Sequence, residues 1–252
     1  MRTTTRGSRS GSPRHNDRTY LEKDKRPTGN VYGYAWRKSM PNATFEEGEL
    51  EYYRRRYLKG LEARNERYMK QGHKERCKTI EELYMGKKTC PTETLFQIGN
   101  MDKHPDPELL RICYLEYMQQ IQAWNKEHGN HFHILDCAIH LDEETPHAHE
   151  RSIMDVTDKY GHLIIAQEKA LKEAGIELPE PDKPESRYNN RKITFDKMRR
   201  ELFQDICRSH GLNITVEPRP QRMKHKSTRD YKRQQAELEA QKLKQQILRG
   251  GR

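Results

Sequence analysis

The stretch HLDEETPHAH, His140 to His149, decides the fold that the sequence predicts. The run 131–141 before it is rich in apolar residues and predicts a strand, and the run 148–156 after it predicts a second strand from a weaker pattern. Residues 142–146 between the two runs favour a loop, and Pro146 prevents regular structure from continuing. We therefore expect a β-hairpin with a connection of five or six residues.

The spacing of the three histidines predicts that their rings converge. His147 and His149 are two residues apart in a strand, so both imidazoles point to the same face of the sheet. His140 lies near the end of the partner strand, where a cross-strand neighbour comes within about 5 Å, and Glu143 reaches over from the connection. Three protein ligands with open positions are typical of a catalytic metal site. Nitrogen and oxygen ligands suit Mn, Mg, Zn or a related divalent ion.

Two other interpretations of the stretch compete with a catalytic metal site. The first is a polar hairpin whose histidines face solvent. The second is a zinc protease, whose signature requires two histidines one helical turn apart with a glutamate between them. That signature does not occur in this sequence.

The composition predicts a single modest core and much exposed chain. Hydrophobic residues make up 32% of the 252 residues, and the mean hydropathy is -1.21. No apolar run approaches the length of a membrane span, and the N-terminus lacks the apolar core of a signal peptide. The five cysteines are scattered, odd in number and without a CxxC pair. These features predict a soluble cytoplasmic protein with structural thiols.

The charge is concentrated at the two ends of the chain. The formal net charge is +10, whereas residues 1–38 carry ten Lys or Arg against three acids and residues 217–252 carry eleven against four. The part between them is therefore slightly acidic. Basic flanks around such a body predict a polyanionic partner, most plausibly nucleic acid. The alternative is that these charge runs are solvated surfaces without a partner.

The same pattern predicts three parts of the chain. Residues 1–14 combine Ser, Thr, Gly and Arg without an apolar period, which predicts a flexible basic arm. Residues 15–216 form the main domain. Residues 217–252 form a basic linker and a helical tail, whose apolar residues follow coiled-coil spacing for too short a distance to establish a dimer.

Helix and strand signals between these ends predict an α+β fold. Thr44 and Glu47 form a capping box that starts a long helix ending at Gly72. Asp106 and Pro107 start a second helix that closes near His128. We expect the remaining elements at 30–36 (a short aromatic strand or a base-stacking surface), 79–85 (a helical turn), 93–98 (a strand), 167–174 and 194–210 (helices) and 212–216 (an edge strand). This order predicts an antiparallel or mixed sheet with helices on one face.

Two motifs together resemble those of the MobV-type plasmid mobilisation relaxases, also called plasmid recombination (Mob/Pre) enzymes. An early HNxR motif occurs here as His15–Arg18, and an HxDExTPHxH motif occurs as His140–His149. The strand end Phe96–Asn100 is also similar to members of this group. The resemblance extends from about Arg6 to Gly211, and the longer motif is highly specific.

The resemblance implies both a fold and a chemistry. The fold would be that of HUH-type nucleases, an antiparallel sheet backed by helices with a metal site on its face. The reaction would be the nicking of one DNA strand at a plasmid origin of transfer, with the enzyme left covalently on the 5′ phosphate. His15 would be the nucleophile and Glu143 a ligand or proton acceptor. The metal ligands would be His140, His147 and His149, and the ion Mn²⁺ or Mg²⁺.

The residues around the early motif carry further expectations. Arg14 and Arg18 could hold adjacent phosphates bidentately, and Asn16 joins them as a predicted DNA contact. Tyr20 is an alternative nucleophile, because tyrosine serves this role more often among HUH enzymes. The implied partner is DNA, both single-stranded and duplex, and the tail is a candidate surface for a dimer or for the conjugation machinery.

Three alternatives to a relaxase stay open from the sequence. A rolling-circle replication initiator or transposase of the same superfamily would use the same metal chemistry. A non-catalytic DNA-binding protein of plasmid control would keep the basic flanks and lack cleavage. A metallohydrolase acting on small molecules is the least supported, because it would not need two basic flanks.

Overall fold

The structure is a computed structural model that describes residues 1–8, 11–100, 102–215, 233 and 237. The chain divides into two compact units, Met1–Thr215 and Val216–Arg252. The description below concerns the first unit. The predicted tail over 217–252 lies outside the described residues, apart from Arg233 and Glu237, and stays a prediction.

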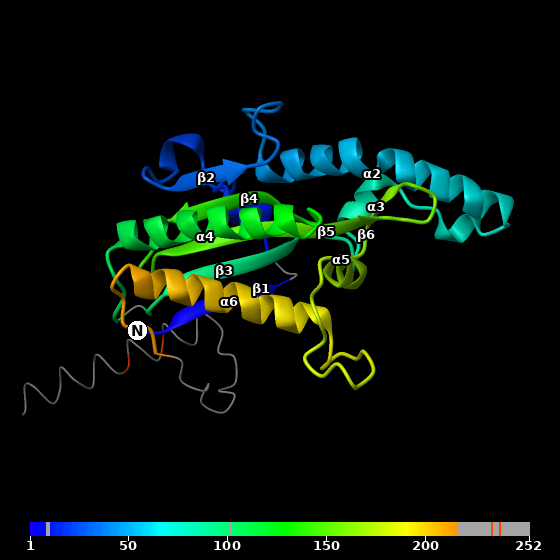
Figure 1. Ribbon diagram of the computed structural model, residues 1–252. Helices are drawn as coiled ribbons and strands as arrows, with labels where there is room; N and C mark the ends of the chain where they lie inside the picture. The colour runs from blue at the N-terminus through cyan, green and yellow to red at the C-terminus, as the bar shows by residue number, and fades with distance from the viewer. Residues whose placement is uncertain (9–10, 101, 216–232, 234–236, 238–252) are drawn as a thin grey trace, which may run out of the picture. The chain divides into compact units, whose positions relative to one another are not determined.

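A six-stranded antiparallel sheet forms the centre of the first unit (Figure 1). Its strand order is β1-β3-β5-β4-β2, with β6 paired to β5. The strands are β1 (Thr3–Ser8), β2 (Val31–Tyr34), β3 (Thr92–Ile98), β4 (Phe132–His140), β5 (His147–Thr157) and β6 (Leu163–Ile165). The α-helices are α1 (Pro13–Asn16), α2 (Phe45–Lys70), α3 (Ile80–Tyr84), α4 (Pro107–Glu127), α5 (Gln167–Glu173) and α6 (Arg191–Ser209). The predicted α+β class with an antiparallel sheet is confirmed.

The predicted hairpin is formed by β4 and β5, joined by residues 141–146. Its register pairs His140 with His147, and Ala138 with His149. Both strands lie inside the sheet, because β2 pairs with β4 and β3 pairs with β5 on their outer sides. The histidine stretch therefore lies on two strands that each have a hydrogen-bonded neighbour on both sides.

One face of the sheet packs against α4 and α6 (Figure 1). Alternate residues of β5 point to this side, so Ala148 and Val156 belong to the same core as Phe96 of β3. The apolar side of α4 packs on this core, and the ring of Tyr117 lies 4.6 Å from that of Phe96. Burying such aromatic surface supplies most of the driving force for docking a helix on a sheet.

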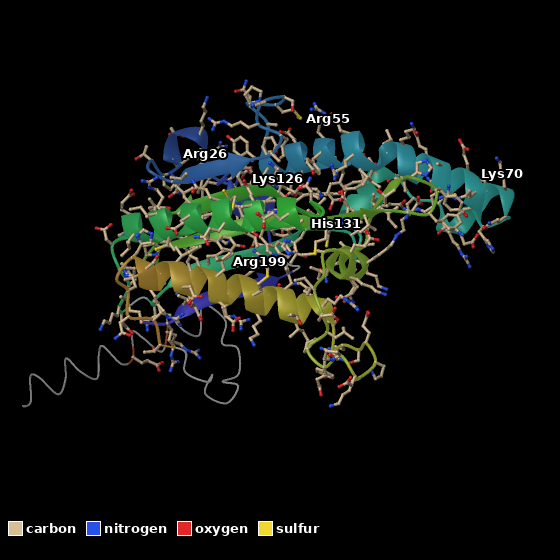
Figure 2. All side chains as sticks on the ribbon, in the orientation of Figure 1. Arg26, Arg55, Lys70, Lys126, His131 and Arg199 are labelled. Carbon is tan, nitrogen blue, oxygen red and sulfur yellow. The ribbon has the colours of Figure 1, made fainter. Side chains whose placement is uncertain are left out.

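A buried ion pair crosses the interface between α6 and the sheet. Arg199, labelled in Figure 2, pairs with Glu150 of β5 and donates to the hydroxyl of Tyr117 at 2.7 Å. All three side chains are buried. A carboxylate inside a strand is tolerated here because its charge is matched by a guanidinium of the covering helix.

The other face of the sheet is partly covered by α2 and α3, which corrects the expectation of helices on one face only. Tyr53 and Tyr57 of α2 pack against Leu135 of β4 and Ile153 of β5. The long helix can cover the sheet because its aromatic residues form a buried stripe on one side. The capping box of Thr44 and Glu47 at its start is confirmed.

The N-terminal residues are not the flexible arm expected over 1–14. Thr3–Ser8 forms strand β1, which pairs with β3 from Thr3 opposite Ile98 to Ser8 opposite Glu93. The polar composition hid this strand, because an edge strand needs hydrogen bonds from one neighbour rather than burial on both sides. Its three threonines are β-branched and favour extended backbone.

The predicted edge strand at 212–216 does not form over the described residues 212–215. Leu212 and Ile214 instead pack into the core between the sheet and α6. Strand β1 occupies the free edge of β3, so no edge of that strand is left for a second partner.

All five cysteines are free, and Cys113, Cys137 and Cys207 are buried, as structural thiols are. Within the part of the chain that the structure describes, no helix is long and apolar enough to cross a lipid bilayer.

Candidate metal centre

Three histidines of the hairpin converge on the sheet face that α2 partly covers, as their spacing predicted. Their ring centroids lie 5.3 Å apart for His140 and His147, 5.0 Å for His140 and His149, and 4.7 Å for His147 and His149. His140 is fully buried, and the other two are nearly so. The alternative of a hairpin with solvent-exposed histidines is therefore wrong.

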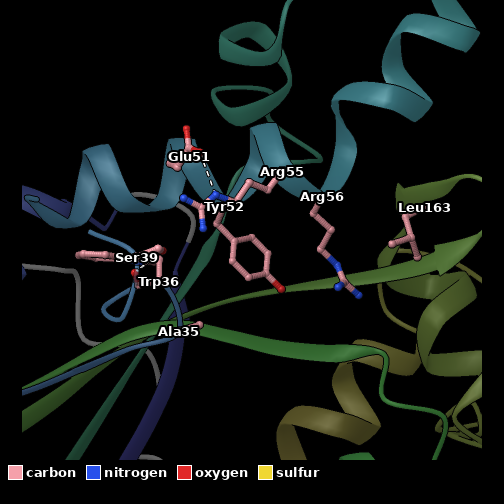
Figure 3. Close-up of a pocket in the computed structure, with 8 residues that line it drawn as sticks. All are labelled: Ala35, Trp36, Ser39, Glu51, Tyr52, Arg55, Arg56 and Leu163. Carbon is pink, nitrogen blue, oxygen red and sulfur yellow. Dashed lines mark hydrogen bonds and ion pairs between the residues drawn. The ribbon is translucent and has the colours of Figure 1, made fainter. Parts of the chain in front are cut away.

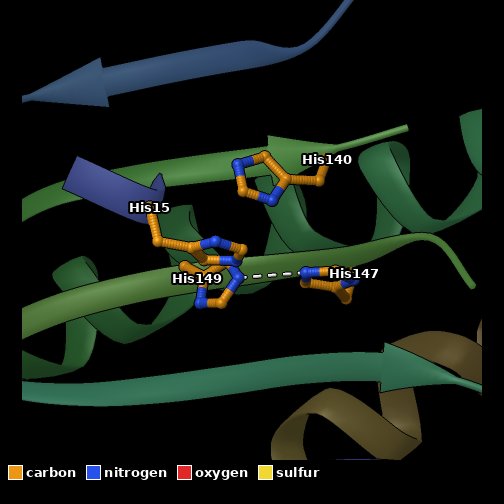
Figure 4. Close-up of side chains that lie close together, drawn as sticks. All are labelled: His15, His140, His147 and His149. Carbon is orange, nitrogen blue, oxygen red and sulfur yellow. Dashed lines mark hydrogen bonds between the residues drawn. The ribbon is translucent and has the colours of Figure 1, made fainter. Parts of the chain in front are cut away.

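His15 joins the same cluster from a distant part of the sequence (Figure 4). It lies on the short helix α1, which Ser12 caps and Pro13 begins. Its ring centroid is 5.6 Å from that of His140 and 5.3 Å from that of His149. One nitrogen from each of the four histidines falls within 4.8 Å of the other three.

Asn16 fastens α1 to the sheet through two hydrogen bonds. Its backbone carbonyl lies 2.9 Å from Nε2 of His140, and its side-chain amide donates to Oε2 of Glu93 on β3 at 2.8 Å. A carbonyl oxygen can only accept, so Nε2 of His140 carries the proton and Nδ1 of the neutral ring carries a lone pair. That Nδ1 is buried and has no hydrogen-bond partner among the described residues.

The other two hairpin histidines are oriented by contacts to their Nδ1 atoms. Nδ1 of His147 lies 2.9 Å from the carbonyl oxygen of Thr145, and Nδ1 of His149 lies 3.2 Å from Oε1 of Glu93. The Thr145 carbonyl can only accept, so the ring proton of His147 is on Nδ1 and its Nε2 carries a lone pair. The anionic Glu93 carboxylate favours the same tautomer of His149. The two Nε2 atoms face each other at 2.9 Å.

Lone pairs that face each other repel unless a proton or a cation lies between them. Here the unprotonated nitrogens of His140, His147 and His149 point into one small space, where the described side chains place no donor for His140. Three converging imidazole nitrogens fit a divalent transition-metal ion, and the Glu93 carboxylate contacts the other nitrogen of the His149 ring. The cluster can therefore hold such an ion.

Burial favours the neutral form of three of these rings, those of His140, His147 and His15. Desolvation lowers the pKa of His140 to about 4. It also lowers the pKa of His147 and of His15 below the ordinary value of 6.5. Neutral imidazole is the form that binds a metal or attacks an electrophile, so the site is prepared for both roles.

Glu143 reaches over the cluster from the hairpin connection, as predicted. Its two carboxylate oxygens lie 3.7 Å from Nδ1 of His140 and 4.0 Å from Nε2 of His147. Arg18 donates to Glu143 at 2.5 Å. Burial alone would raise the pKa of Glu143, but the hydrogen bond from Arg18 and the nearby His147 outweigh it and lower that pKa. Glu143 is therefore an anion close to the cluster.

Arg18 is buried within the site and contacts its carboxylates, and its predicted contact to a phosphate stays a prediction. It is 4% exposed and, besides Glu143, it contacts Asp142 at 3.4 Å. Its backbone is left-handed, with φ of 59°. A side chain other than glycine rarely adopts this conformation unless surrounding contacts hold it. Asn16 is likewise buried and bonded inside the site, whereas Arg14 is exposed and its DNA contact stays a prediction.

The two candidate nucleophiles lie side by side. The ring of Tyr20 stacks on that of His15, with centroids 6.1 Å apart and planes 12° apart. The Tyr20 hydroxyl accepts a hydrogen bond from Arg18 at 3.2 Å, and the side chain is 52% exposed. Because both groups lie near the cluster, their positions alone do not select His15 or Tyr20 as the nucleophile.

Glu93 is the site residue that the sequence did not reveal. It contacts both His149 and Asn16, and it lies on β3, which pairs with β5 in the sheet. A weak signal was present, because Glu93 alternates with the core residues Thr94 and Phe96 and so points to the opposite face. What the sequence could not show was that β3 and β5 are neighbours.

A separate cavity of about 440 Å³ lies against α2, away from the histidines (Figure 3). Trp36, Tyr52, Arg55 and Arg56 are among the residues that line it. Trp36 is only 4% exposed and packs with Phe45 and Ala138. The aromatic run 30–36 therefore contributes mainly to the core.

Comparisons with known proteins found one similar solved structure. No protein-family model matches the chain. No curated protein sequence matches it either. The similar structure is described as the MobM relaxase domain (MOBV; Mob_Pre) bound to plasmid pMV158 oriT DNA, in a Mn-bound crystal structure. It is 15% identical, with a TM-score of 0.49, and the match covers 92% of this chain and 99% of that one. The DNA and the manganese in that description belong to the neighbour.

Proposed function

We propose that this chain is a metal-dependent relaxase that nicks one strand of DNA at a plasmid origin of transfer and remains attached to the 5′ phosphate. The observation that carries the proposal is the cluster itself. Four histidines from two distant motifs meet beside a carboxylate, and three of them present ring nitrogens to one space. The two motifs are those that resemble the MobV family.

His140, His147 and His149 would hold the divalent ion. A bound ion of this kind neutralises charge on the phosphoryl oxygens and aligns the scissile phosphate. The contacts of Asn16, Thr145 and Glu93 fix the three rings before any ion or DNA arrives. This preorganisation removes the need to reorient side chains during the reaction.

His15 is the proposed nucleophile. A nitrogen of its neutral ring attacks the phosphorus, and the bond to the leaving 3′ oxygen breaks. The second ring nitrogen then gives up its proton, and Glu143 is the nearby anion that can accept it. The covalent step conserves the energy of the phosphodiester, so the strand can be rejoined afterwards. Arg18 keeps Glu143 ionised and in place for this role.

The basic flanks supply the proposed affinity for DNA. The chain carries a net charge of +10 concentrated toward its ends, and each lysine or arginine that contacts a phosphate releases condensed counterions. Arg14 is exposed one residue before His15. We propose that it holds a phosphate close to the scissile bond.

A trapping experiment tests the proposal. The protein and Mn²⁺ are incubated with supercoiled DNA that carries the region upstream of its own gene, and denaturation then reveals whether protein is covalently bound to a nicked strand. An acid-labile adduct that disappears in His15→Ala establishes a phosphohistidine relaxase.

The same experiment separates the alternatives. An acid-stable adduct that disappears in Tyr20→Phe keeps the relaxase and moves the nucleophile to the stacked tyrosine. Tight metal binding with no adduct on any upstream fragment contradicts the proposal and favours a non-catalytic DNA-binding protein.

A further inference from the structure

The cluster contains one histidine more than the predicted set of metal ligands. His15 enters it with a ring nitrogen within 4.8 Å of the ligand nitrogens of the other three. A divalent ion with metal–nitrogen bonds of about 2.1 Å can bridge nitrogens that lie up to ~4.2 Å apart. The contact of 2.9 Å between His147 and His149 is within that reach, and a pair at the 4.8 Å limit of the cluster would need to close by about 0.6 Å.

The hydrogen bonds around the cluster distinguish His15 from the other three. Each hairpin histidine uses one nitrogen for a contact that orients it, to Asn16, Thr145 or Glu93. Among the described residues, no hydrogen bond reaches a ring nitrogen of His15, whose ring is held only by its stacking on Tyr20 and its edge contacts to the other histidines. Its orientation is therefore set by packing, and both nitrogens are available.

The backbone fixes His15 in this place even without DNA. Its neighbour Asn16 is fully buried and bonds to both His140 and Glu93. The next residue, Asp17, accepts a hydrogen bond from the backbone amide of Phe45 at the start of α2, at 2.8 Å. The short helix α1 is thus tied to β4, β3 and α2, and it carries His15 to the cluster as part of the fold.

We propose that His15 is a fourth metal ligand in the DNA-free protein, and that a phosphate oxygen of the substrate replaces it. This proposal rests on the proposed function and adds a regulatory step to it. In the exchange, the bond between the ion and the His15 nitrogen breaks as the bond between the ion and the phosphate oxygen forms, without any redox change. The nucleophile is therefore masked until a phosphate occupies the position beside it.

The test measures metal binding rather than cleavage. Co²⁺ is titrated into the full-length protein without DNA and followed by calorimetry and visible absorption, for wild type, His15→Ala and the control His210→Gln. His210 is an exposed histidine that pairs with Glu116 away from the cluster. We expect His15→Ala to weaken Co²⁺ binding by at least ~10-fold and to change the absorption spectrum, and His210→Gln to change neither.

Inorganic phosphate serves as the probe for displacement. Added to the Co²⁺-loaded wild type, it should shift the spectrum toward that of His15→Ala with phosphate. Unchanged Co²⁺ affinity and spectrum in His15→Ala would overturn the proposal. A pulsed EPR measurement on Mn²⁺-loaded wild type avoids mutation altogether, because four coupled imidazole nitrogens support the proposal and three contradict it. None of these results depends on strand cleavage, so a failure of the relaxase function is detected separately by the absence of a covalent adduct.

Discussion

The two halves of strand β5 present buried polar groups to the same face of the sheet, but the groups of one half are satisfied by ion pairs, whereas in the unsatisfied half ring nitrogens point at one another. Toward the end of the strand, Arg151 forms two hydrogen bonds to Glu49 at 2.5 and 2.9 Å. Asp155 accepts hydrogen bonds from Arg56 at 2.5 Å and from Tyr57 at 2.7 Å. Toward its start, the histidines face one another with lone pairs. Buried polar groups are normally paired, so the unsatisfied half, whose ring nitrogens point at one another, is the half that is suited to receive a ligand.

This comparison separates residues that hold the fold from residues that perform chemistry. Breaking a pair in the satisfied half should lower stability and leave metal binding intact. Removing a histidine from the unsatisfied half should abolish metal binding and leave stability nearly unchanged. Five predictions test or refine this division.

The largest expected effect is on cleavage. Replacing His147 or His149 with Ala should reduce strand cleavage by about 10³-fold or more, because stabilisation of the developing phosphoryl charge is lost. Divalent-metal affinity should fall with it, while the free energy of unfolding of the metal-free protein stays within ~1 kcal/mol of wild type. Nicking assays, metal titration and urea unfolding measure the three quantities. Cleavage that survives both changes would show that the histidines are not the metal site.

The satisfied half should respond in the opposite way. Arg151→Met leaves the fully buried carboxylate of Glu49 without its cation and should lower the free energy of unfolding by ~3–5 kcal/mol. The double variant Glu49→Leu with Arg151→Met should be less destabilised than the single one, since no charge is left uncompensated. Metal affinity of the folded single variant should fall far less than in His149→Ala, because Arg151 reaches the cluster only through a 3.9 Å contact with Glu93. If that affinity falls as far as in His149→Ala, the two halves are not independent.

The two halves should also lose stability in different pH windows. The folded pKa of His140 is lowered by burial to about 4, from 6.5. The unfolded chain therefore binds more protons between these values, and metal-free stability falls as the pH drops from 6.5 toward 4, by ~2–3 kcal/mol. Burial alone would raise the pKa of Asp155, but its hydrogen bonds from His133, Arg56 and Tyr57 outweigh it and lower that pKa. Its contribution is present above the ordinary value of 3.8 and is lost at lower pH.

Urea unfolding at several pH values measures both windows. His140→Gln should reduce the loss between pH 6.5 and 4 and leave the loss below pH 4 as in wild type. If the free energy of unfolding of His140→Gln falls between pH 6.5 and 4 as steeply as that of wild type, His140 is not the group that causes this loss.

A smaller effect is expected at the residue that links the cluster to α1. Glu93→Gln removes the anion behind His149 and weakens the support of Asn16, so metal affinity should fall by ~10–100-fold. Glu144→Gln is the matched control, because it makes the same charge change at an exposed position of the hairpin connection. Calorimetric metal titration compares the two. Equal affinities in both variants would exclude a positioning role for Glu93.

The smallest effect concerns DNA contact outside the cluster. Arg14→Ala should weaken DNA binding and reduce the slope of log K against log salt by about one. Arg76→Ala, at an exposed position beside Glu75, should leave that slope unchanged. Fluorescence anisotropy over a series of salt concentrations measures both slopes. An unchanged slope in Arg14→Ala would rule out a phosphate contact by this residue.

The hairpin and the converging histidines could be predicted from the sequence because they depend on local geometry. The period of two in a strand fixes which side chains share a face, and six residues of loop between His140 and His147 leave one simple pairing. The helices beginning after Thr44 and at Pro107 were predictable for the same reason, since their capping residues act within one turn.

The remaining features depend on which distant segments become neighbours. β1 carries no apolar pattern, and its strand exists because β3 offers a free edge. Deleting the N-terminal residues 1–12 would thus remove a strand of the sheet. Glu93 has an ordinary sequence context, and the motif around Arg18 does not reveal its bond to Glu143. Both contacts arise only once β3 and the 141–146 connection lie beside α1. The resemblance to relaxase motifs supplied the role of His15, which neither composition nor spacing could have given.

A β-bulge in β4 separates the two halves of the sheet face. The register with β5 shifts between Ile134 and Asp136, leaving Leu135 as the extra residue. The alternation of β4 side chains between the two faces of the sheet is therefore interrupted at Leu135. His133 and His140 share a face although an odd number of positions separates them, which would place them on opposite faces of a regular strand. Deleting Leu135 would leave Ile134 opposite Ser152 and Asp136 opposite Arg151, so both halves of the strand would keep their faces and only the buried Leu135 side chain would be lost. The bulge therefore buffers the sheet against a change of one residue in length, because such a change at this point need not reach the histidine end of the strand.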